Sequence, residues 1–232
     1  MSDAFAVLEA TWPAASKRIV GPWEIKEGAG GGKRVMAAKP VAPVTADDIA
    51  IAEQAMSDLG QPHLFVLRPK DAELDSILAQ NGYDIIDPTL LFTGPLDPDD
   101  VPTVTTFDIW PPLQIMRDLW AEQSVGPDRI AVMERAAEPK TSILGRVKDR
   151  AAGALFVSIH DQIAMAHAVA VLPDFRRLNL ARNMMHAASA WALAQGATQM
   201  AIAVTDANDA AKSLYRSLGM TEVGRYHYRI KP

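Results

Sequence analysis

Tyr215 stands in a part of the sequence where a phenol could donate a proton to a bound ligand. It belongs to the segment Asn208–Met220, which follows the strand-like run Met200–Val204 and contains Gly219. We expect a short helix here, because glycine permits the left-handed conformation that ends many helices. At helical spacing, one face of that helix carries Asn208, Ala211 and Tyr215, while Leu214 and Leu218 point elsewhere, into the core. The alternative interpretation is an ordinary amphipathic helix with a surface tyrosine.

A second polar cluster lies earlier in the chain, in Val169–Arg182. An apolar strand breaks there at Pro173, and a helix is predicted to begin at about Leu180. The start of a helix offers N–H groups without intrahelical partners and the positive end of the helix dipole, which together suit a pyrophosphate. Three arginines add positive charge for phosphates: Arg176, Arg177 and Arg182. Asn179 and Ala181 stand where the backbone must pass close to the ligand, and asparagine tolerates left-handed angles well.

Together the two clusters resemble the GNAT acetyltransferase superfamily. In that family a strand ending in Val-x-Pro leads into Arg/Gln-x-x-Gly-x-Gly/Ala, whose amides hold the pyrophosphate of coenzyme A. A later Asn-x-x-Ala-x-x-Leu-Tyr-x-x-x-Gly-Phe segment contacts the pantetheine arm. The loop motif is matched by Arg176, Asn179 and Ala181, and the later motif by Asn208, Ala211, Leu214, Tyr215 and Gly219. Asn179 replaces the first glycine of the loop, Met220 replaces the usual aromatic residue, and the resemblance covers about Thr105–Pro232.

The resemblance implies an acetyl-CoA-dependent N-acetyltransferase that acts by direct acyl transfer on a small-molecule or peptide amine. Acetyl-CoA would be the co-substrate, no metal would be needed, and Tyr215 would protonate the departing thiolate. The implied cofactor-binding residues are Val169, Ala170, Val171, Arg176, Arg177, Leu178, Asn179, Leu180, Ala181, Arg182, Asn208, Ala211 and Tyr215. Two alternatives remain open: a non-catalytic acyl-CoA-binding or sensor protein, and an O-acyltransferase.

The best candidate for a general base is His167. With the period-2 alternation of a strand it would share a face with Val169 and Val171. A histidine with a pKa of about 6.5 can deprotonate an ammonium group directly or through water. A strand histidine that is only packed and hydrogen-bonded is the competing interpretation. Glu122 and Glu134 are weaker candidates, since charges on short helices usually belong to solvated faces.

Composition excludes several other classes of function. The net charge of −5 over 232 residues argues against broad nucleic-acid binding. There is no cysteine, hence no disulfide or thiolate chemistry, and the five histidines lack metal-ligand spacing. The N-terminal residues do not resemble a signal peptide, and no apolar run approaches the length needed to cross a bilayer. We therefore expect a cytoplasmic protein, monomeric or homodimeric, without nucleic-acid or membrane partners.

The order of elements suggests a duplication. The proline-rich, acidic stretch Gly94–Pro102 resembles a linker, and we predict two lobes, residues 1–98 and 103–232. The first lobe is predicted to run helix Asp48–Gly60, strand His63–Arg68, helix Ala72–Asn81 and strand Tyr83–Phe92; the second ends with the same order, helix Met184–Gly196, strand Met200–Val204, helix Asn208–Leu218 and strand Met220–Ile230. A long loop within one domain and a coincidental order of elements are the alternatives.

The first copy has lost the features suited to a cofactor. Aligned on its glycines, it places Pro40 and Pro43 at the positions of Arg176 and Asn179, and proline has no N–H to offer a phosphate. Asp71 and Leu78 likewise take the places of Asn208 and Tyr215. We therefore expect cofactor in the second lobe alone.

The predicted fold class is α/β (α+β), with two GNAT-like lobes, each a mixed, mostly antiparallel twisted sheet flanked by helices. In the second lobe we expect helices at Leu113–Glu122 and Arg129–Ala136, then strands at Ser142–Val147, Ala154–His160 and Ile163–Val171. The break at Pro173 is predicted to splay the last of these strands from Met200–Val204. The glycine-rich Glu27–Arg34 is interpreted as a hairpin turn before a strand at Arg34–Ala38, since it lacks the arrangement of a phosphate-binding loop.

Overall fold

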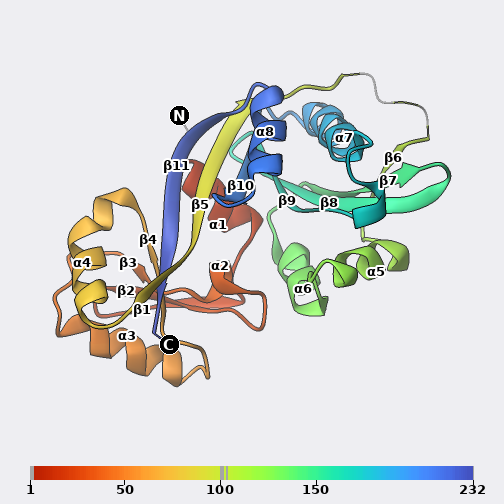
Figure 1. Cartoon of the computed structure of the whole chain (residues 1–232). Helices are drawn as coiled ribbons and strands as arrows, with labels where there is room; N and C mark the ends of the chain where they lie inside the picture. The colour runs from red at the N-terminus through yellow and green to blue at the C-terminus, as the bar shows by residue number, and fades with distance from the viewer. Residues whose placement is uncertain (1–2, 100–101, 103, 232) are drawn as a thin grey trace.

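The computed structural model describes residues 3–99, 102 and 104–231 (Figure 1). The first half comprises α1 (Ala4–Thr11), β1 (Ser16–Val20), β2 (Trp23–Glu27), α2 (Lys33–Met36), β3 (Lys39–Pro40), α3 (Asp48–Ser57), β4 (Leu64–Leu67), η1 (Pro69–Asp71), α4 (Ala72–Gln80) and β5 (Asp84–Pro95). The second half comprises β6 (Thr106–Ile109), α5 (Gln114–Glu122), α6 (Pro127–Arg135), β7 (Lys140–Val147), β8 (Arg150–His160), β9 (Ile163–Val171), η2 (Pro173–Phe175), α7 (Leu180–Ala194), β10 (Gln199–Thr205), α8 (Asp209–Ser217) and β11 (Thr221–Ile230).

These elements confirm the predicted fold class, a mostly antiparallel α/β architecture with helices on the sheet. A large sheet has the strand order β4-β11-β5-β10-β9-β8-β7-β6, and a smaller one has the order β1-β2-β3. Within the large sheet only β9 and β10 pair in parallel. The strands and helices predicted for the second lobe are present at nearly the predicted residues.

The two halves exchange their last strands. Strand β5 of the first half lies between β10 and β11, with Phe92 opposite Ile202, and β11 lies between β4 and β5, with Tyr228 opposite Val66. Figure 1 shows β5 and β11 running side by side from one half to the other. Neither predicted lobe, residues 1–98 or 103–232, therefore holds a complete sheet by itself, and that division stays a prediction.

The predicted linker Gly94–Pro102 falls partly on residues 100 and 101, which lie outside the described residues. Its first two residues belong to β5, because Gly94 pairs with Met200 and Pro95 with Gln199. A side chain at Gly94 would collide with the backbone of Met220, so this strand position requires glycine for close approach.

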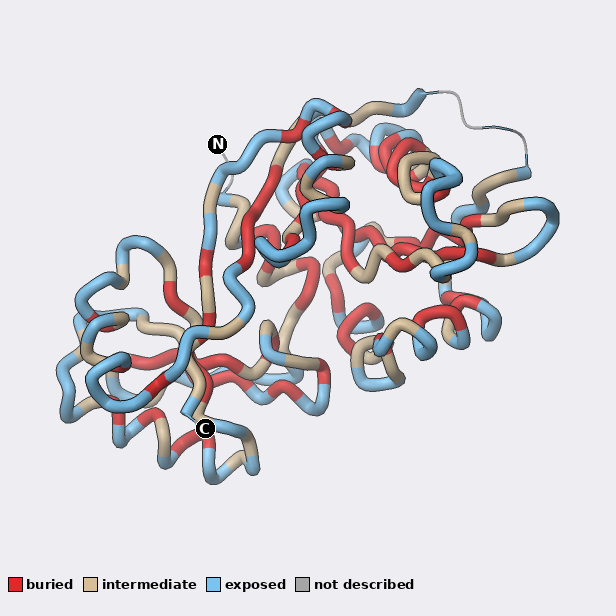
Figure 2. Tube along the Cα trace, in the orientation of Figure 1, coloured by how far each residue is buried: buried red, intermediate tan, exposed pale blue. Residues whose placement is uncertain are grey.

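Helices cover both faces of the large sheet. On one face α7 and α8 pack their apolar residues, Met184 and Leu214 among them, against the centre of the sheet. On the other face α5, α6 and α1 cover the strands around Phe156. Figure 2 shows the buried stretches concentrated along the strands and the inner faces of these helices. A further apolar cluster around Trp23 and Phe65 lies under α3 and α4.

The parallel pair β9 and β10 is short, and its early end opens the sheet. Ile163–Ala166 pairs with Gln199–Ile202, and there the pairing stops. Just beyond, Ala168 adopts a positive φ of 48°, and the register of β9 against β8 shifts between Ala154 and Phe156. Such an extra residue is a β-bulge, which bends its strand. The predicted splay is thus present, but β9 leaves β10 after Ala166 and not at Pro173.

The interpretation of the glycine-rich segment as a hairpin turn is wrong. The hairpin lies one element earlier, between β1 and β2, and the expected strand Arg34–Ala38 is replaced by the short helix α2. The glycines instead allow close packing against α6, since a Cβ at Gly31 would lie 2.5 Å from Cγ2 of Val132. The segment therefore lies where the first half of the chain packs against the second.

Candidate functional site

The bulge in β9 leaves backbone N–H groups without strand partners. The Leu172 N–H donates to the carbonyl of Ala152 on β8, at 2.9 Å. Because N–H groups alternate along a strand, that of Ala170 also faces β8, while those of Val169 and Val171 face the side that β10 has left. Of the three backbone amides predicted to meet the cofactor, two therefore point into the opening.

The bulge is held by an indole. Nε1 of Trp120, on α5, donates to the carbonyl oxygen of Ala168 at 2.8 Å. This bond satisfies a backbone acceptor that the bulge would otherwise leave without a partner. Trp120 was not among the predicted site residues, because nothing in its local sequence pattern distinguishes it from a core residue.

The loop after β9 has the backbone geometry that the sequence suggested. Asn179 precedes α7 in the left-handed region, with φ 60° and ψ 8°, and its side chain makes no capping hydrogen bond. The first intrahelical bond runs from Asn183 N to Asn179 O, at 3.0 Å. The N–H groups of Leu180, Ala181 and Arg182 therefore lie at the positive end of the helix without intrahelical acceptors.

The arginines of this loop are not neutralised by acidic groups. Arg176 donates to the carbonyl of Val171 and to Oε1 of Gln123, both at 3.2 Å, and Arg182 donates to the hydroxyl of Ser217 at 2.6 Å. Arg177 and Leu178 are exposed. Within the described part of the chain, none of these three arginines forms an ion pair with a carboxylate, so their charge is available to an anion.

On α8 the ring of Tyr215 packs into the core, which corrects the predicted division of faces. Tyr215 is 4% exposed, packs near Phe92, and belongs to the same apolar cluster as Leu218. Its hydroxyl has no hydrogen-bond partner among the described residues. This oxygen is nevertheless not among the fully buried side-chain atoms that lack a partner in the described structure. The tip of the tyrosine therefore keeps some contact with solvent, and burial of the ring raises its pKa.

Asn208 serves as the N-cap of α8. Its Oδ1 accepts a hydrogen bond from the N–H of Ala211 at 3.1 Å, the usual function of asparagine at this position. The two polar residues predicted on this helix thus have different surroundings: Asn208 is exposed at its start, and Tyr215 is buried beneath it.

His167 does not share a face with Val169 and Val171, because the bulge at Ala168 reverses the alternation of the strand. Its ring lies on the α1 side of the sheet, with its centroid 4.9 Å from that of Trp12, whereas the two valines pack on the α7 side. Nε2 of His167 lies 2.9 Å from Oγ1 of Thr11, whose hydroxyl donates to Val7 O. Nε2 therefore carries the hydrogen.

The other nitrogen of His167, Nδ1, faces a guanidinium. Nη1 of Arg34 lies 3.4 Å away, and the histidine is 4% exposed. Burial, and secondly the charge of Arg34, hold the pKa of His167 well below its ordinary value. The surroundings are those of a packed, neutral histidine with both nitrogens occupied, which weakens the case for His167 as a general base.

The two weaker candidates for the base are at the surface. Glu122 is exposed, and Glu134 pairs with Arg117 at 3.7 Å. Across the described residues no group of histidine and acidic side chains could hold a metal ion. No helix found there is long and apolar enough to cross a membrane.

Comparison with known proteins agrees with this geometry. Residues 110–220 match the acetyltransferase (GNAT) family. The chain is 26% identical over 239 residues to an uncharacterized N-acetyltransferase of Bacillus subtilis (strain 168), covering 96% of this chain and 95% of that protein. In fold it is similar to a GCN5-related N-acetyltransferase from Kribbella flavida, with a TM-score of 0.73 and 17% identity over 99% of this chain and 94% of the other.

A second solved structure bears on the duplication. A tandem GNAT protein from the clavulanic acid biosynthesis pathway matches with a TM-score of 0.59 and 15% identity, over 89% of this chain and 76% of the other. At this identity the likeness concerns the fold alone. It agrees with the arrangement of two related halves that the order of elements predicted.

Proposed function

Because the chain belongs to the GNAT acetyltransferase superfamily, whose domain spans residues 110–220, we propose that it transfers an acetyl group from acetyl-CoA to an amine. The observation that carries this proposal is the opening between β9 and β10. There the free N–H groups of Val169 and Val171 lead directly to the uncapped start of α7. This arrangement suits a long ligand with an amide-bearing arm and a pyrophosphate at one end.

The residues of the loop fit the anionic part of coenzyme A. The N–H groups of Leu180, Ala181 and Arg182 would bind the pyrophosphate, with Arg176 and Arg177 supplying charge. The left-handed Asn179 turns the backbone so that these donors face the same side. When bound, acetyl-CoA supplies an activated acyl group, and the remaining chemistry depends on this chain.

The transfer needs a polarised carbonyl and a proton for sulfur. The N–H groups of Val169 and Val171 are placed to stabilise negative charge on the thioester oxygen. As the amine nitrogen bonds to the carbonyl carbon and the carbon–sulfur bond breaks, the amine loses a proton and the thiolate gains one. Tyr215 would donate the proton to sulfur, since its raised pKa keeps the hydroxyl protonated at neutral pH.

We propose one cofactor for each chain, in the second half. In the first half, Pro40 ends β3 and Pro43 follows, so no N–H group is available at the matched positions. The acceptor is proposed to be a small-molecule or peptide amine, and the protein to act in the cytoplasm as a monomer or homodimer.

Calorimetric titration with acetyl-CoA, followed by thiol release in the presence of a panel of amines, tests the proposal. We expect one site per chain with a Kd in the micromolar range, which corresponds to a binding free energy of about −8 kcal/mol. Thiol release should depend on the amine. Two equivalent sites would contradict the assignment to the second half. Binding without thiol release for any amine or alcohol would instead indicate a sensor.

A further inference from the structure

A separate cavity of about 220 Å³ lies on the α1 face of the sheet, between α1, β2, β3, β4 and β11. Its apolar wall includes Phe5, Trp12, Tyr226 and Tyr228. Pockets for drug-sized ligands usually measure about 300–1,000 Å³. The volume here therefore suits a smaller organic molecule.

The cavity occupies the place in the first half that corresponds to the opening between β9 and β10. Ala38, just before β3, forms an isolated parallel bridge with Phe65 on β4, where Val66 N donates to Ala38 O at 3.0 Å. Immediately afterwards Lys39 leaves β4 and pairs with Glu24 on β2. The first half thus keeps an opening at the matched position, although it lacks the donors for a pyrophosphate.

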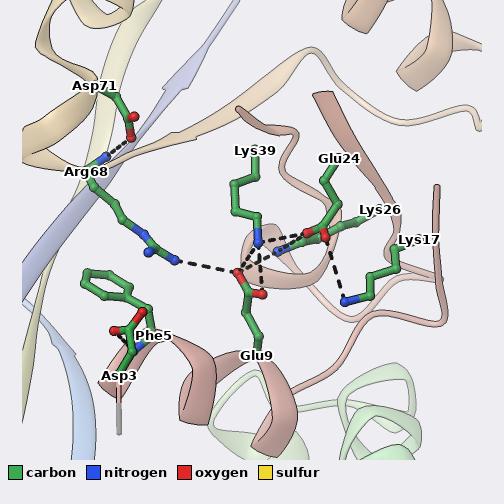
Figure 3. Close-up of polar contacts among 9 residues, drawn as sticks. All are labelled: Asp3, Phe5, Glu9, Lys17, Glu24, Lys26, Lys39, Arg68 and Asp71. Carbon is green, nitrogen blue, oxygen red and sulfur yellow. Dashed lines mark hydrogen bonds and ion pairs between the residues drawn. The ribbon is translucent and has the colours of Figure 1, made fainter. Parts of the chain in front are cut away.

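One wall of the cavity carries a network of charges (Figure 3). Glu9 accepts from Lys39 at 2.7 Å and lies 3.6 Å from Arg68 and 3.7 Å from Lys26. The buried Oε1 of Glu24 lies 3.1 Å from Nζ of Lys39 and 3.8 Å from Nζ of Lys26. Lys17 lies 3.7 Å from the other oxygen of Glu24, so four cations surround two carboxylates. The network therefore has an excess of positive charge.

A fifth cation, Arg34, lines the same cavity from α2. Its Nε lies 3.3 Å from the hydroxyl of Tyr226, and Nη1 faces the neutral His167. Arg34 takes part in none of the ion pairs formed by the described residues. An interior charge without a counter-ion is costly, so a cavity beside it indicates where the counter-ion binds.

We infer that this cavity binds a small molecule bearing a carboxylate, which pairs with Arg34, and a hydrogen-bond donor such as an ammonium group, which meets Glu24. A planar carboxylate matches the fork of a guanidinium. The excess of lysine and arginine side chains around the cavity favours the carboxylate of the ligand, while Glu24 offers an acceptor to its donor end. The aromatic wall would contact the carbon chain between the two ends.

The test uses the whole protein without acetyl-CoA, so its result does not depend on acetyl transfer. The probes are ω-amino acids from glycine to 6-aminohexanoate, each beside its amide, with binding followed by NMR of the Trp12 indole N–H. We expect saturable binding for the chain length that spans the cavity. The amide should bind about ten- to a hundredfold more weakly, because it cannot form the charged pair with Arg34. If no acid binds better than its amide, the inference is wrong.

Arg34→Met should weaken the acid about ten- to a hundredfold and bring its affinity to that of the amide. The matched control is Arg18→Met, since Arg18 is exposed on β1 and does not line the cavity. Without ligand, Arg34→Met should change the Tm little, because the loss of an interior charge without a counter-ion offsets the loss of its hydrogen bonds with Tyr226 and His167. A lower Tm with unchanged affinity would make Arg34 a structural residue and overturn the inference. If Arg34→Met does not fold, the comparison of acids with amides on the unaltered protein still decides.

Adding acetyl-CoA then distinguishes two roles for the bound amino acid. If the bound amino acid is acetylated, it is the acceptor. If it changes turnover with another amine and is not consumed, the cavity is a regulatory site.

Discussion

Replacing Tyr215 with phenylalanine tests the proposed chemistry most directly. The change removes the hydroxyl and keeps the ring, which is 4% exposed and packs near Phe92. Because that hydroxyl has no partner in the described structure, its loss leaves no buried group unsatisfied. We therefore expect the free energy of unfolding to change by less than about 1 kcal/mol. If the hydroxyl protonates the departing thiolate, kcat should fall about 10²-fold, which corresponds to about 2.7 kcal/mol.

Tyr83→Phe provides a matched control. Tyr83 is also buried, but its hydroxyl donates to Oε1 of Glu53 at 2.5 Å. Removing this charge-assisted bond should cost about 1.5–3 kcal/mol of stability, and lower the Tm by about 2–4 °C for each kcal/mol. Turnover per folded molecule should not change.

The assay measures Tm, the Kd for acetyl-CoA and thiol release on the same preparations. Unchanged turnover in Tyr215→Phe would refute the assignment of the acid and leave thiolate departure unassisted. A loss of stability like that of Tyr83→Phe, with the rate per folded molecule retained, would give the hydroxyl a structural role instead.

Three further predictions concern the loop and the buried histidine. Asn179→Gly should keep or improve affinity for acetyl-CoA in calorimetry, because glycine adopts φ 60° without strain; a large loss would mean that the amide side chain contacts the ligand. Arg176→Ala should weaken that binding by about 1–3 kcal/mol, and the exposed Arg18→Ala should not. Because the pKa of His167 is lowered on folding, the unfolded chain binds a proton more readily, so stability should fall as the pH drops below about 6.5. Denaturant titrations at several pH values should show that stability falls less steeply with falling pH in His167→Gln than in the control His160→Gln, at a partly exposed histidine. Equal slopes would contradict the buried, neutral state.

Local patterns predicted much of the second half. The strand-like run Ala154–His160 lies within β8, and α7 begins at Leu180, as the sequence predicted. The left-handed backbone at Asn179 was also predictable, because asparagine adopts positive φ more readily than most other residues that could replace glycine.

Long-range contacts account for what the sequence did not predict. The bulge at Ala168 has no glycine to mark it and is held by Trp120, far away in the chain, so the side of the sheet on which His167 lies could not be deduced from alternation. Nor was α1 predicted, the helix whose Thr11 lies against His167 on the same face of the sheet. The packing of the glycine-rich segment on α6 depends on side chains of the other half, Val132 among them.

The exchanged strands have a consequence for synthesis of the chain. Strand β5 emerges from the ribosome about a hundred residues before either β10 or β11 exists to pair with it, and at about 5–20 residues per second this takes several seconds or more. During that time Leu90, Leu91 and Phe92 form an unpaired apolar strand, the kind of segment that associates with other chains. This protein should therefore need a chaperone most during the part of its synthesis before β10 has emerged.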